Sequence, residues 1–263
     1  MTLTGKRALV TGAGRGAGEG IAHALANAGA DVAVCDLDEA SSKATALAIS
    51  EKGVKSLGLR TDVSSEDDVQ AMIDATVAEF GGIDILVNTV AWIDPPGPIV
   101  SMPYERWRTG IRINLDSVFL CSKAALPVMQ GAGTGGLIIN VSSVNGTRGF
   151  PNRAVYGATK AAILNLTETL FMENRQYGIR VNCLVPGGIS GGVRGRILGE
   201  LAAQEGVDFF PKDFPTFEPP LRSASPLELG EYVVFLAGPT GEAINGQCLW
   251  IGEAPRWGGQ VLL

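Results

Sequence analysis

Short apolar runs typical of buried β-strands recur along the chain, at residues 8–11, 31–36, 54–61, 84–88, 136–143, 179–185 and 247–251. Between them, apolar positions repeat with the period of an amphipathic helix, at residues 17–29, 39–52, 65–80, 104–130, 152–177 and 226–237. Strands of a parallel sheet with both faces covered have nearly continuous apolar runs, as here. The pattern therefore predicts an α/β fold: a doubly wound parallel sheet of about seven strands with helices on both faces.

Two predicted helices carry start signals. Ser65 stands before three acidic residues, and Ser225 is followed by Pro226 and Glu228. A serine side chain caps the free N–H groups of a first turn, and proline fits that turn without losing a hydrogen bond. No segment rich in glycine, proline or serine divides the chain, so residues 1–263 are expected to form a single domain. It would carry an insertion at about 188–224 and a C-terminal tail at 253–263.

Composition narrows the class of protein. The 263 residues are 46% hydrophobic and carry a net charge of -6, which leaves no basic face for nucleic acid or anionic lipid. No apolar run reaches the roughly 18 residues of a membrane helix, and the first predicted strand leaves no room for a signal peptide. The four cysteines lack the spacing of metal ligands, so no metal is expected. A cytoplasmic protein without nucleic-acid or membrane partners is predicted.

A glycine-rich segment, Thr11 to Gly18, lies between the first predicted strand and the first predicted helix. Glycines there allow a tight turn and a close approach of the backbone to a pyrophosphate at the helix N-terminus. Asp36 follows at the end of the second strand, where a carboxylate accepts hydrogen bonds from ribose hydroxyls and repels a 2′-phosphate. The pattern predicts a Rossmann-like nucleotide site that takes NAD rather than NADP.

Two residues near this site allow more than one interpretation. Arg15, inside the glycine-rich segment, could pair with the 2′-phosphate of NADP, although we expect the repulsion from Asp36 to dominate. Asp62, which precedes Val63 at the end of the third strand, could hold the adenine amino group. It could equally cap the helix that follows.

Tyr156 and Lys160 stand four residues apart, so their side chains lie on one face of the predicted helix. A phenol titrates near about 10 in water, and an adjacent cation lowers that pKa toward the range of a useful base. The pair comes thirteen residues after Ser143, which ends the fifth predicted strand. This arrangement predicts proton transfer by Tyr156.

Together these residues make the chain resemble the short-chain dehydrogenase/reductase family, from Lys6 to about Gly252. The motifs that carry the resemblance are the glycines of the TGxxxGxG pattern and Asp62, Asn88, Asn114, Ser143, Tyr156, Lys160, Pro186 and Gly187. The family's enoyl reductases have a longer gap between tyrosine and lysine than this chain has.

The resemblance implies roles for individual residues. Tyr156 would be the proton donor or acceptor, Lys160 would bind the nicotinamide ribose, Ser143 would hold the substrate oxygen, and Asn114 would anchor a water in a proton relay. A homotetramer is also implied. The residues expected to bind the cofactor are Gly12, Arg15, Gly16, Ala17, Gly18, Asp36, Leu37, Asp62, Val63, Asn88, Ala91, Tyr156, Lys160, Pro186, Gly187 and Ile189.

The sequence departs from the family pattern after the fourth strand, where Asn88-Thr-Val-Ala91 replaces Asn-Asn-Ala-Gly. Contacts to the substrate are expected from the insertion at 188–224, with its apolar Phe209, Phe210, Phe214 and Phe217, and from four further residues. These are Trp92, Asn145, Phe150 and Arg153.

Three functions fit these residues. The first is an NAD-dependent oxidoreductase that interconverts a small secondary alcohol, such as a polyol, sugar or cyclic alcohol, and its ketone. The second is a 3-oxoacyl-thioester reductase, which Asp36 disfavours because such enzymes usually prefer NADPH. The third is a dinucleotide-sensing binding protein without catalysis, which the presence of Ser143, Asn114, Tyr156 and Lys160 disfavours.

Overall fold

The computed structural model describes residues 2–190, 193–206, 217–218, 222–252 and 256–257. Its main sheet has seven strands in the order β3-β2-β1-β4-β5-β6-β8, and every neighbouring pair is parallel. This confirms the predicted doubly wound sheet. The strands are β1 (Arg7–Thr11), β2 (Asp31–Asp36), β3 (Ser56–Arg60), β4 (Ile85–Asn88), β5 (Gly136–Val141), β6 (Ile179–Pro186) and β8 (Cys248–Ile251).

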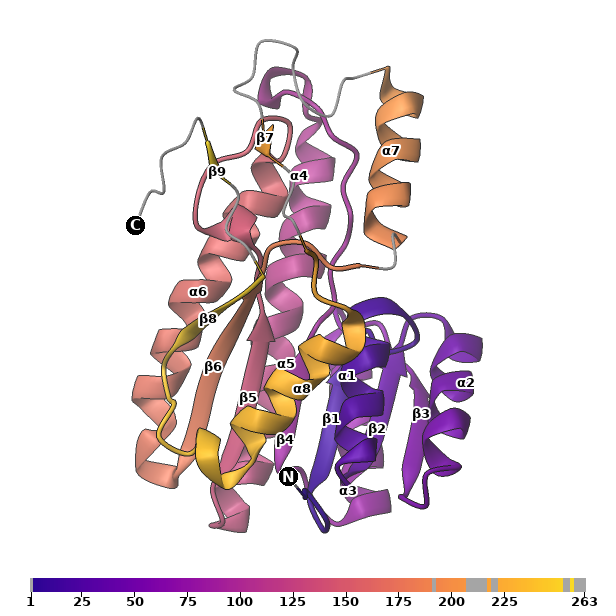
Figure 1. Ribbon diagram of the computed structural model, residues 1–263, viewed down its shortest axis with the longest axis vertical. Helices are drawn as coiled ribbons and strands as arrows, with labels where there is room; N and C mark the ends of the chain where they lie inside the picture. Colours follow the sequence, from indigo (N-terminus) through magenta and orange to yellow (C-terminus); the bar gives the residue numbers. More distant parts are fainter. Residues whose placement is uncertain (1, 191–192, 207–216, 219–221, 253–255, 258–263) are drawn as a thin grey trace.

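Helices cover both faces of this sheet (Figure 1). On one face α1 and α8 pack against each other and, with α2, enclose a core with strand residues such as Val10 and Val34. On the other face α3, α5 and α6 enclose a second core with the alternate strand residues, such as Leu9 and Ala33. The helices are α1 (Gly16–Asn27), α2 (Glu39–Ser50), α3 (Glu66–Phe80), α4 (Tyr104–Ile111), α5 (Ser117–Ala132), α6 (Ala154–Asn174), α7 (Val193–Glu205) and α8 (Pro226–Ala237).

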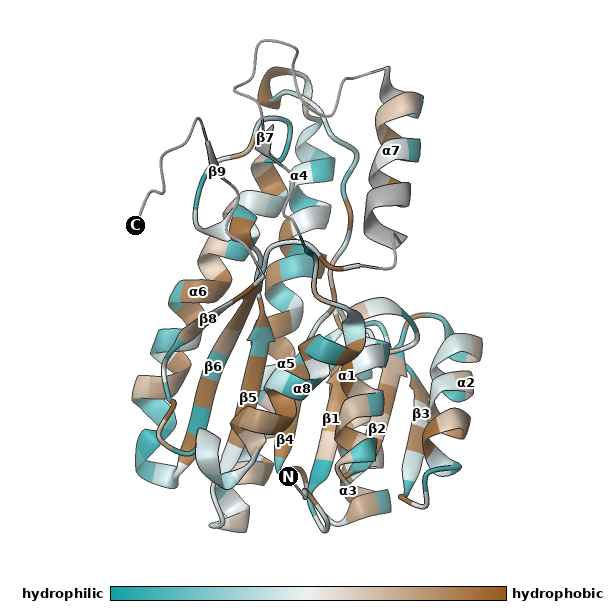
Figure 2. Ribbon diagram, in the orientation of Figure 1, coloured by the Kyte–Doolittle hydropathy of each residue, from teal (hydrophilic) through white to brown (hydrophobic). Residues whose placement is uncertain are grey.

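The strands are brown along most of their length in Figure 2, as expected for a sheet buried on both faces. The predicted helix starts are confirmed. Ser65 accepts a hydrogen bond from the backbone of Asp68 at the start of α3, and Ser225 forms a reciprocal capping box with Glu228 at the start of α8.

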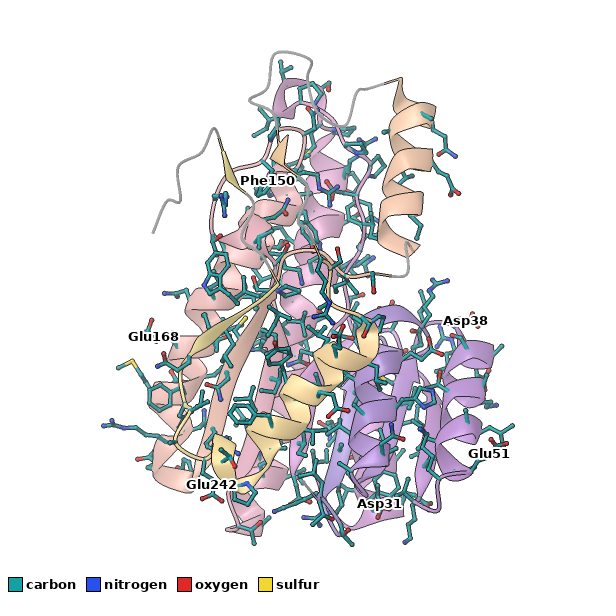
Figure 3. The ribbon with its side chains drawn as sticks, in the orientation of Figure 1. Asp31, Asp38, Glu51, Phe150, Glu168 and Glu242 are labelled. Carbon is teal, nitrogen blue, oxygen red and sulfur yellow. The ribbon has the colours of Figure 1, made fainter. Side chains whose placement is uncertain are left out.

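The strand order places a crevice for ligands at one end of the sheet. β1 lies between β2 and β4, so the chain winds away from β1 in opposite directions on its two sides. In such sheets ligands bind beyond the carboxyl ends of the strands, at this switch point. Figure 3 shows Asp38 and Phe150 at the carboxyl end of the sheet, and Asp31 and Glu242 at the opposite end.

Two segments differ from the prediction. The single helix expected over 104–130 is divided into α4 and α5 by a π-helical turn, Arg112–Asp116. The insertion at 188–224, for which no helix or strand was predicted, contains α7 and the strand β7 (Phe217–Glu218), which pairs antiparallel with β9 (Arg256–Trp257). Phe209, Phe210 and Phe214 and most of the tail at 253–263 lie outside the described residues.

No helix in the part of the chain that the structure describes could cross a membrane. The same residues contain no cluster of potential metal ligands. The cysteines are free; Cys35, Cys121 and Cys183 are buried, whereas Cys248 is exposed.

An ion pair at the amino end of the sheet joins β1 to the start of β4. The Asp84 carboxylate accepts hydrogen bonds from the Arg7 side chain at 2.7 and 3.0 Å and from the Arg7 backbone N–H at 2.9 Å. Burial raises the pKa of Asp84, but the hydrogen bonds from Arg7 outweigh it, so the pKa lies below its ordinary value. The carboxylate therefore stabilises the fold above its unfolded pKa near about 3.9, and this contribution is lost as pH falls through the folded pKa.

Replacing Asp84 with asparagine is expected to lower the free energy of unfolding by about 1.5–3 kcal/mol at neutral pH, since hydrogen bonds to a charged group are lost. Urea denaturation at pH 7 measures this effect. Glu39→Gln is the control: its pair with Lys43 is more than half exposed, so its loss is expected to change the free energy of unfolding much less than the loss of the Asp84 carboxylate. Equal losses in the two variants would contradict the role given to Asp84.

Candidate active site

The glycine-rich turn between β1 and α1 is shaped for an anion. A Cβ at its Gly14 would lie 2.2 Å from the Ser41 Oγ atom and 3.0 Å from the Asp36 Cγ atom, so a side chain there would require Ser41 to shift. A Cβ at Gly18 would lie 2.3 Å from the backbone oxygen of Gly12. The N-terminus of α1 has no side-chain cap. Its first backbone N–H groups therefore donate no hydrogen bond to a capping side chain. This geometry fits a dinucleotide pyrophosphate.

Asp36 lies at the carboxyl end of β2, half-buried, as the nucleotide prediction requires. Its two carboxylate oxygens accept hydrogen bonds from the backbone N–H groups of Gly14, at 3.0 Å, and Asp38, at 3.1 Å. The carboxylate is thus held at the edge of the glycine-rich turn. Arg15 and Leu37 are both exposed beside it, and Ala17 is half-buried.

Asp62 does not cap α3, because that position belongs to Ser65. Instead its Oδ1 atom accepts hydrogen bonds from the Ser64 hydroxyl, at 2.6 Å, and the Ser64 backbone, at 3.0 Å. The Ser64 hydroxyl is the main cause that holds the pKa of Asp62 below its ordinary value; partial burial opposes it and the charge of Arg112 supports it. A charged carboxylate therefore stands at the end of β3 beside the buried Val63.

In the segment after β4, where the sequence departs from the family pattern, Thr89 forms hydrogen bonds to the end of β1. Thr89 donates a hydrogen bond from its hydroxyl to the Thr11 backbone oxygen, and its N–H donates to the Thr11 hydroxyl at 3.1 Å. The segment after β4 is thereby tied to the end of β1. Asn88 is buried and donates to Asn140 at 2.9 Å, whereas Ala91 is exposed.

Asn114 is held by the π-helical turn between α4 and α5. The turn contains Asn114, which is fully buried. Its side-chain oxygen accepts from the Trp92 N–H at 2.6 Å, and its amide donates to the Trp92 oxygen at 3.3 Å. The π turn breaks the predicted continuous helix at this position, and such turns often occur at functional sites.

Ser143 follows β5 and caps the short 3₁₀ turn Val144–Gly146, which packs against α6. Its hydroxyl accepts from the Asn145 backbone N–H at 3.2 Å, and the residue is almost fully buried. The close packing depends on Gly146, where a Cβ would lie 2.6 Å from the Lys160 backbone. Ser143 is therefore held next to the helix that carries Tyr156 and Lys160.

Tyr156 and Lys160 lie one turn apart in α6, and both are buried. The Lys160 ammonium lies 5.7 Å from the centre of the Tyr156 ring and donates a hydrogen bond to the Val141 oxygen at 2.7 Å. A cation at this distance stabilises the ionised form of a phenol. The expected pairing of phenol and ammonium is present in the structure.

Pro186 ends β6 at the same end of the sheet, and Gly187 and Ile189 follow it. Gly187 donates to the Ile251 backbone at 3.0 Å, and Ile189 pairs with Ala224 in an isolated parallel bridge. The two ends of the insertion are therefore joined beside the candidate site.

The four residues expected to touch the substrate have different surroundings. Trp92, Asn145 and Phe150 are half-buried, and Phe150 packs against a buried cluster that includes Val144 and Ile163. Arg153 is fully buried, and it pairs with a residue that the sequence analysis missed.

That residue is Asp94, in the segment after β4. The Arg153 Nη1 atom lies 3.0 Å from its Oδ1 atom and 2.8 Å from its backbone oxygen. The only sequence signal for Asp94 was an acid placed among apolar and proline residues, Trp92-Ile-Asp-Pro-Pro96.

Comparisons with known proteins identify the family of this chain. A family model described as enoyl-(acyl carrier protein) reductase matches residues 12–252. The chain is 38% identical to a short chain dehydrogenase/reductase (astE) of Aspergillus oryzae, over 93% of this chain and 92% of the other. It is 35% identical to the cis-4-hydroxycyclohexanecarboxylate dehydrogenase of Sinomonas cyclohexanicum, over 92% and 93%.

A 3-oxoacyl-[acyl-carrier-protein] reductase of Staphylococcus aureus is 37% identical, over 94% of this chain and 96% of its own. Among solved structures, NAD⁺-bound xylitol dehydrogenase superposes with a TM-score of 0.88 at 31% identity, covering 96% of this chain and 99% of the other. The chain belongs to the short-chain dehydrogenase/reductase family.

Proposed function

We propose that this protein is an NAD(H)-dependent oxidoreductase that interconverts a secondary alcohol and its ketone. The observation that carries the proposal is the buried Tyr156 with the Lys160 ammonium 5.7 Å from its ring. The pair lies on α6, which packs against the turn that Ser143 begins. A phenol kept beside a cation is suited to proton transfer at neutral pH.

In alcohol oxidation, Tyr156 as phenolate would accept the hydroxyl proton of the substrate, and in the reverse direction it would return that proton. Ser143 would donate a hydrogen bond to the substrate oxygen as charge develops there. Asn114, held by Trp92, would anchor a water that relays protons. A bound nicotinamide dinucleotide would supply the hydride acceptor or donor.

Lys160 would act in two ways. Its ammonium has three N–H donors, one of which goes to the Val141 oxygen. That hydrogen bond holds the ammonium at the end of β5. A second N–H donor would bind a ribose hydroxyl of the cofactor. Its charge would also favour the phenolate form of Tyr156.

NAD is proposed rather than NADP because Asp36 holds a carboxylate at the end of β2. A carboxylate there accepts from ribose hydroxyls and repels a 2′-phosphate. The other residues proposed to hold the cofactor lie at the same end of the sheet, on the glycine-rich turn, after β3 and β4, and after β6.

A small secondary alcohol, such as a cyclic alcohol or polyol, is the proposed substrate class. Relatives named for cyclohexane derivatives and for xylitol support this proposal. Contacts by Trp92, Asn145, Phe150 and Arg153 remain predictions. Reduction of 3-oxoacyl thioesters is an alternative function, because one relative is named as a 3-oxoacyl reductase. The carboxylate of Asp36 disfavours this alternative. A dinucleotide-binding protein without catalysis is the second alternative.

We also propose a homotetramer and a cytoplasmic location. Leu227, Tyr232 and Trp250 are exposed apolar side chains on α8 and β8, as expected where a surface is covered by another subunit. The apolar end of the chain, Val261 to Leu263, lies outside the described residues.

The proposal is tested by two assays on the purified protein. In a thermal-shift titration, NAD⁺ is expected to raise the unfolding temperature at lower concentration than NADP⁺. A panel of cyclic alcohols, polyols and 3-oxoacyl thioesters is then followed by NADH or NADPH absorbance. Turnover of a secondary alcohol with NAD⁺ supports the proposal. Turnover of 3-oxoacyl thioesters alone supports the 3-oxoacyl-thioester reductase. Binding of a dinucleotide without any turnover supports the dinucleotide-sensing protein.

A further inference from the structure

Arg153 and Asp94 form an ion pair that water does not reach. Their side chains are 1% and 0% exposed, and the Arg153 Nη1 atom lies 3.0 Å from the Asp94 Oδ1 atom. The same nitrogen donates to the Asp94 backbone oxygen at 2.8 Å. Asp94 belongs to the segment after β4, whereas Arg153 immediately precedes α6. The pair therefore connects two elements at the carboxyl end of the sheet.

Stability does not by itself account for this pair. Burying two charges costs about as much as their attraction recovers, and apolar residues of similar volume often stabilise a fold equally well. The reason for burying this ion pair is therefore sought in the groups that it contacts, and Tyr156 is one of them.

The guanidinium carbon of Arg153 lies 4.8 Å from the centre of the Tyr156 ring, closer than the Lys160 ammonium at 5.7 Å. A guanidinium stays charged at every relevant pH. At this distance and this degree of burial, water screens its charge only weakly. The cation therefore stabilises the phenolate of Tyr156 relative to the neutral phenol, and it also fixes the ring by packing on it.

We propose that Arg153 is a positioning residue that acts through Tyr156: it orients the ring and favours its ionised form, while Asp94 holds the guanidinium and moderates its charge. This inference rests on the proposed role of Tyr156 in proton transfer. It gives Arg153 a function other than the substrate contact expected from the sequence.

Other charged or titratable groups lie on the elements around α6, and the test must separate them from Arg153. Glu105 and Arg108 on α4 pair with each other at the surface, Arg112 in the π turn donates to the Ser64 hydroxyl, and the Cys183 thiol on β6 lies near Lys160. Further charged groups on or near the elements that pack against α6 are Arg106, Asp116, Arg148, Arg175 and Arg180.

The test measures the ionisation of Tyr156 without substrate or cofactor. The chain has four tyrosines, and Tyr104, Tyr177 and Tyr232 are exposed. The ultraviolet absorbance of ionised phenol is followed against pH in the apo protein. Subtracting the same titration of Tyr156→Phe isolates the signal of Tyr156.

Four variants then give an ordered result. Arg153→Met is expected to raise the midpoint of the Tyr156 titration by about one pH unit, since it removes the cation and leaves Asp94. The double variant Asp94→Asn with Arg153→Met removes both charges and raises the midpoint less. Asp94→Asn alone lowers the midpoint, and Arg153→Lys keeps it near the wild-type value because the charge is retained. Arg108→Met, which removes an exposed charge on α4, is the control and leaves the midpoint unchanged.

The double variant also guards against unfolding, because it removes both charges of the buried pair together. A wild-type midpoint in both Arg153→Met and the double variant would overturn the inference, as would a rise in Asp94→Asn. In turnover assays, the rising limb of the pH profile is expected to follow the same order. If the wild-type protein turns over no alcohol but the titration order holds, the proposed function fails and the effect of Arg153 on Tyr156 stands.

Discussion

Replacing Tyr156 with phenylalanine is expected to lower kcat by about 10²–10⁴-fold, the usual contribution of general acid–base catalysis. The ring is buried, so phenylalanine keeps its packing and removes only the hydroxyl. The affinity for NADH should therefore change little, because the glycine-rich turn and Asp36 are untouched. Steady-state kinetics with an alcohol substrate and a fluorescence titration with NADH measure the two effects separately.

Tyr104→Phe is the matched control, since Tyr104 is 74% exposed on α4 and its hydroxyl is expected to be dispensable. Turnover in Tyr156→Phe within a few-fold of wild type would remove Tyr156 from the mechanism. A loss of NADH binding equal to the loss of turnover would instead show that the substitution damages the cofactor site.

Replacing Asp36 with asparagine has the second largest expected effect. The ratio of kcat/KM for NAD⁺ to that for NADP⁺ should fall by about 100-fold, because a like-charge contact with the 2′-phosphate costs several kcal/mol. The nearby exposed Arg15 could then pair with that phosphate. Part of the change is a weaker interaction with NAD⁺, since an amide is a poorer acceptor than a carboxylate.

Asp38→Asn is the control for this prediction. Asp38 is an exposed carboxylate two residues away, and its side chain caps α2 by accepting from the Ala40 N–H at 3.1 Å. Asparagine caps a helix about as well as aspartate, so stability should be retained and only one negative charge lost. If Asp38→Asn changed the cofactor ratio as much as Asp36→Asn, general charge rather than ribose recognition would set the preference.

Most of the fold could be predicted from the sequence because local pattern and global topology agree in this chain. The apolar runs that predicted strands lie in the sheet, and Ser65 and Ser225 begin helices as expected. The break at Arg112–Asp116 could not be predicted, since the helical period continues through it. The turn lies where Asn114 pairs with the backbone of Trp92, a tertiary contact that the local pattern does not show. In the insertion, α7 was missed because glycines interrupt its sequence.

The candidate site, like the fold, could be predicted only in part from the sequence. Tyr156, Lys160 and the glycine-rich turn have fixed spacings along the chain, so the sequence could place them together. The partner of Arg153 could not be found in this way, because Asp94 is separated from it by 59 residues and stands in a segment with no regular pattern. Arg153 was therefore expected to face the substrate, whereas the structure buries its guanidinium between Asp94 and Tyr156.

A crystal structure of the protein with bound NAD⁺ tests the central claim most directly. The account predicts the pyrophosphate at the N-terminus of α1, the adenosine ribose on Asp36, and the nicotinamide ring within reach of the Tyr156 hydroxyl. A dinucleotide bound elsewhere, or a Tyr156 hydroxyl directed away from the nicotinamide, would contradict it.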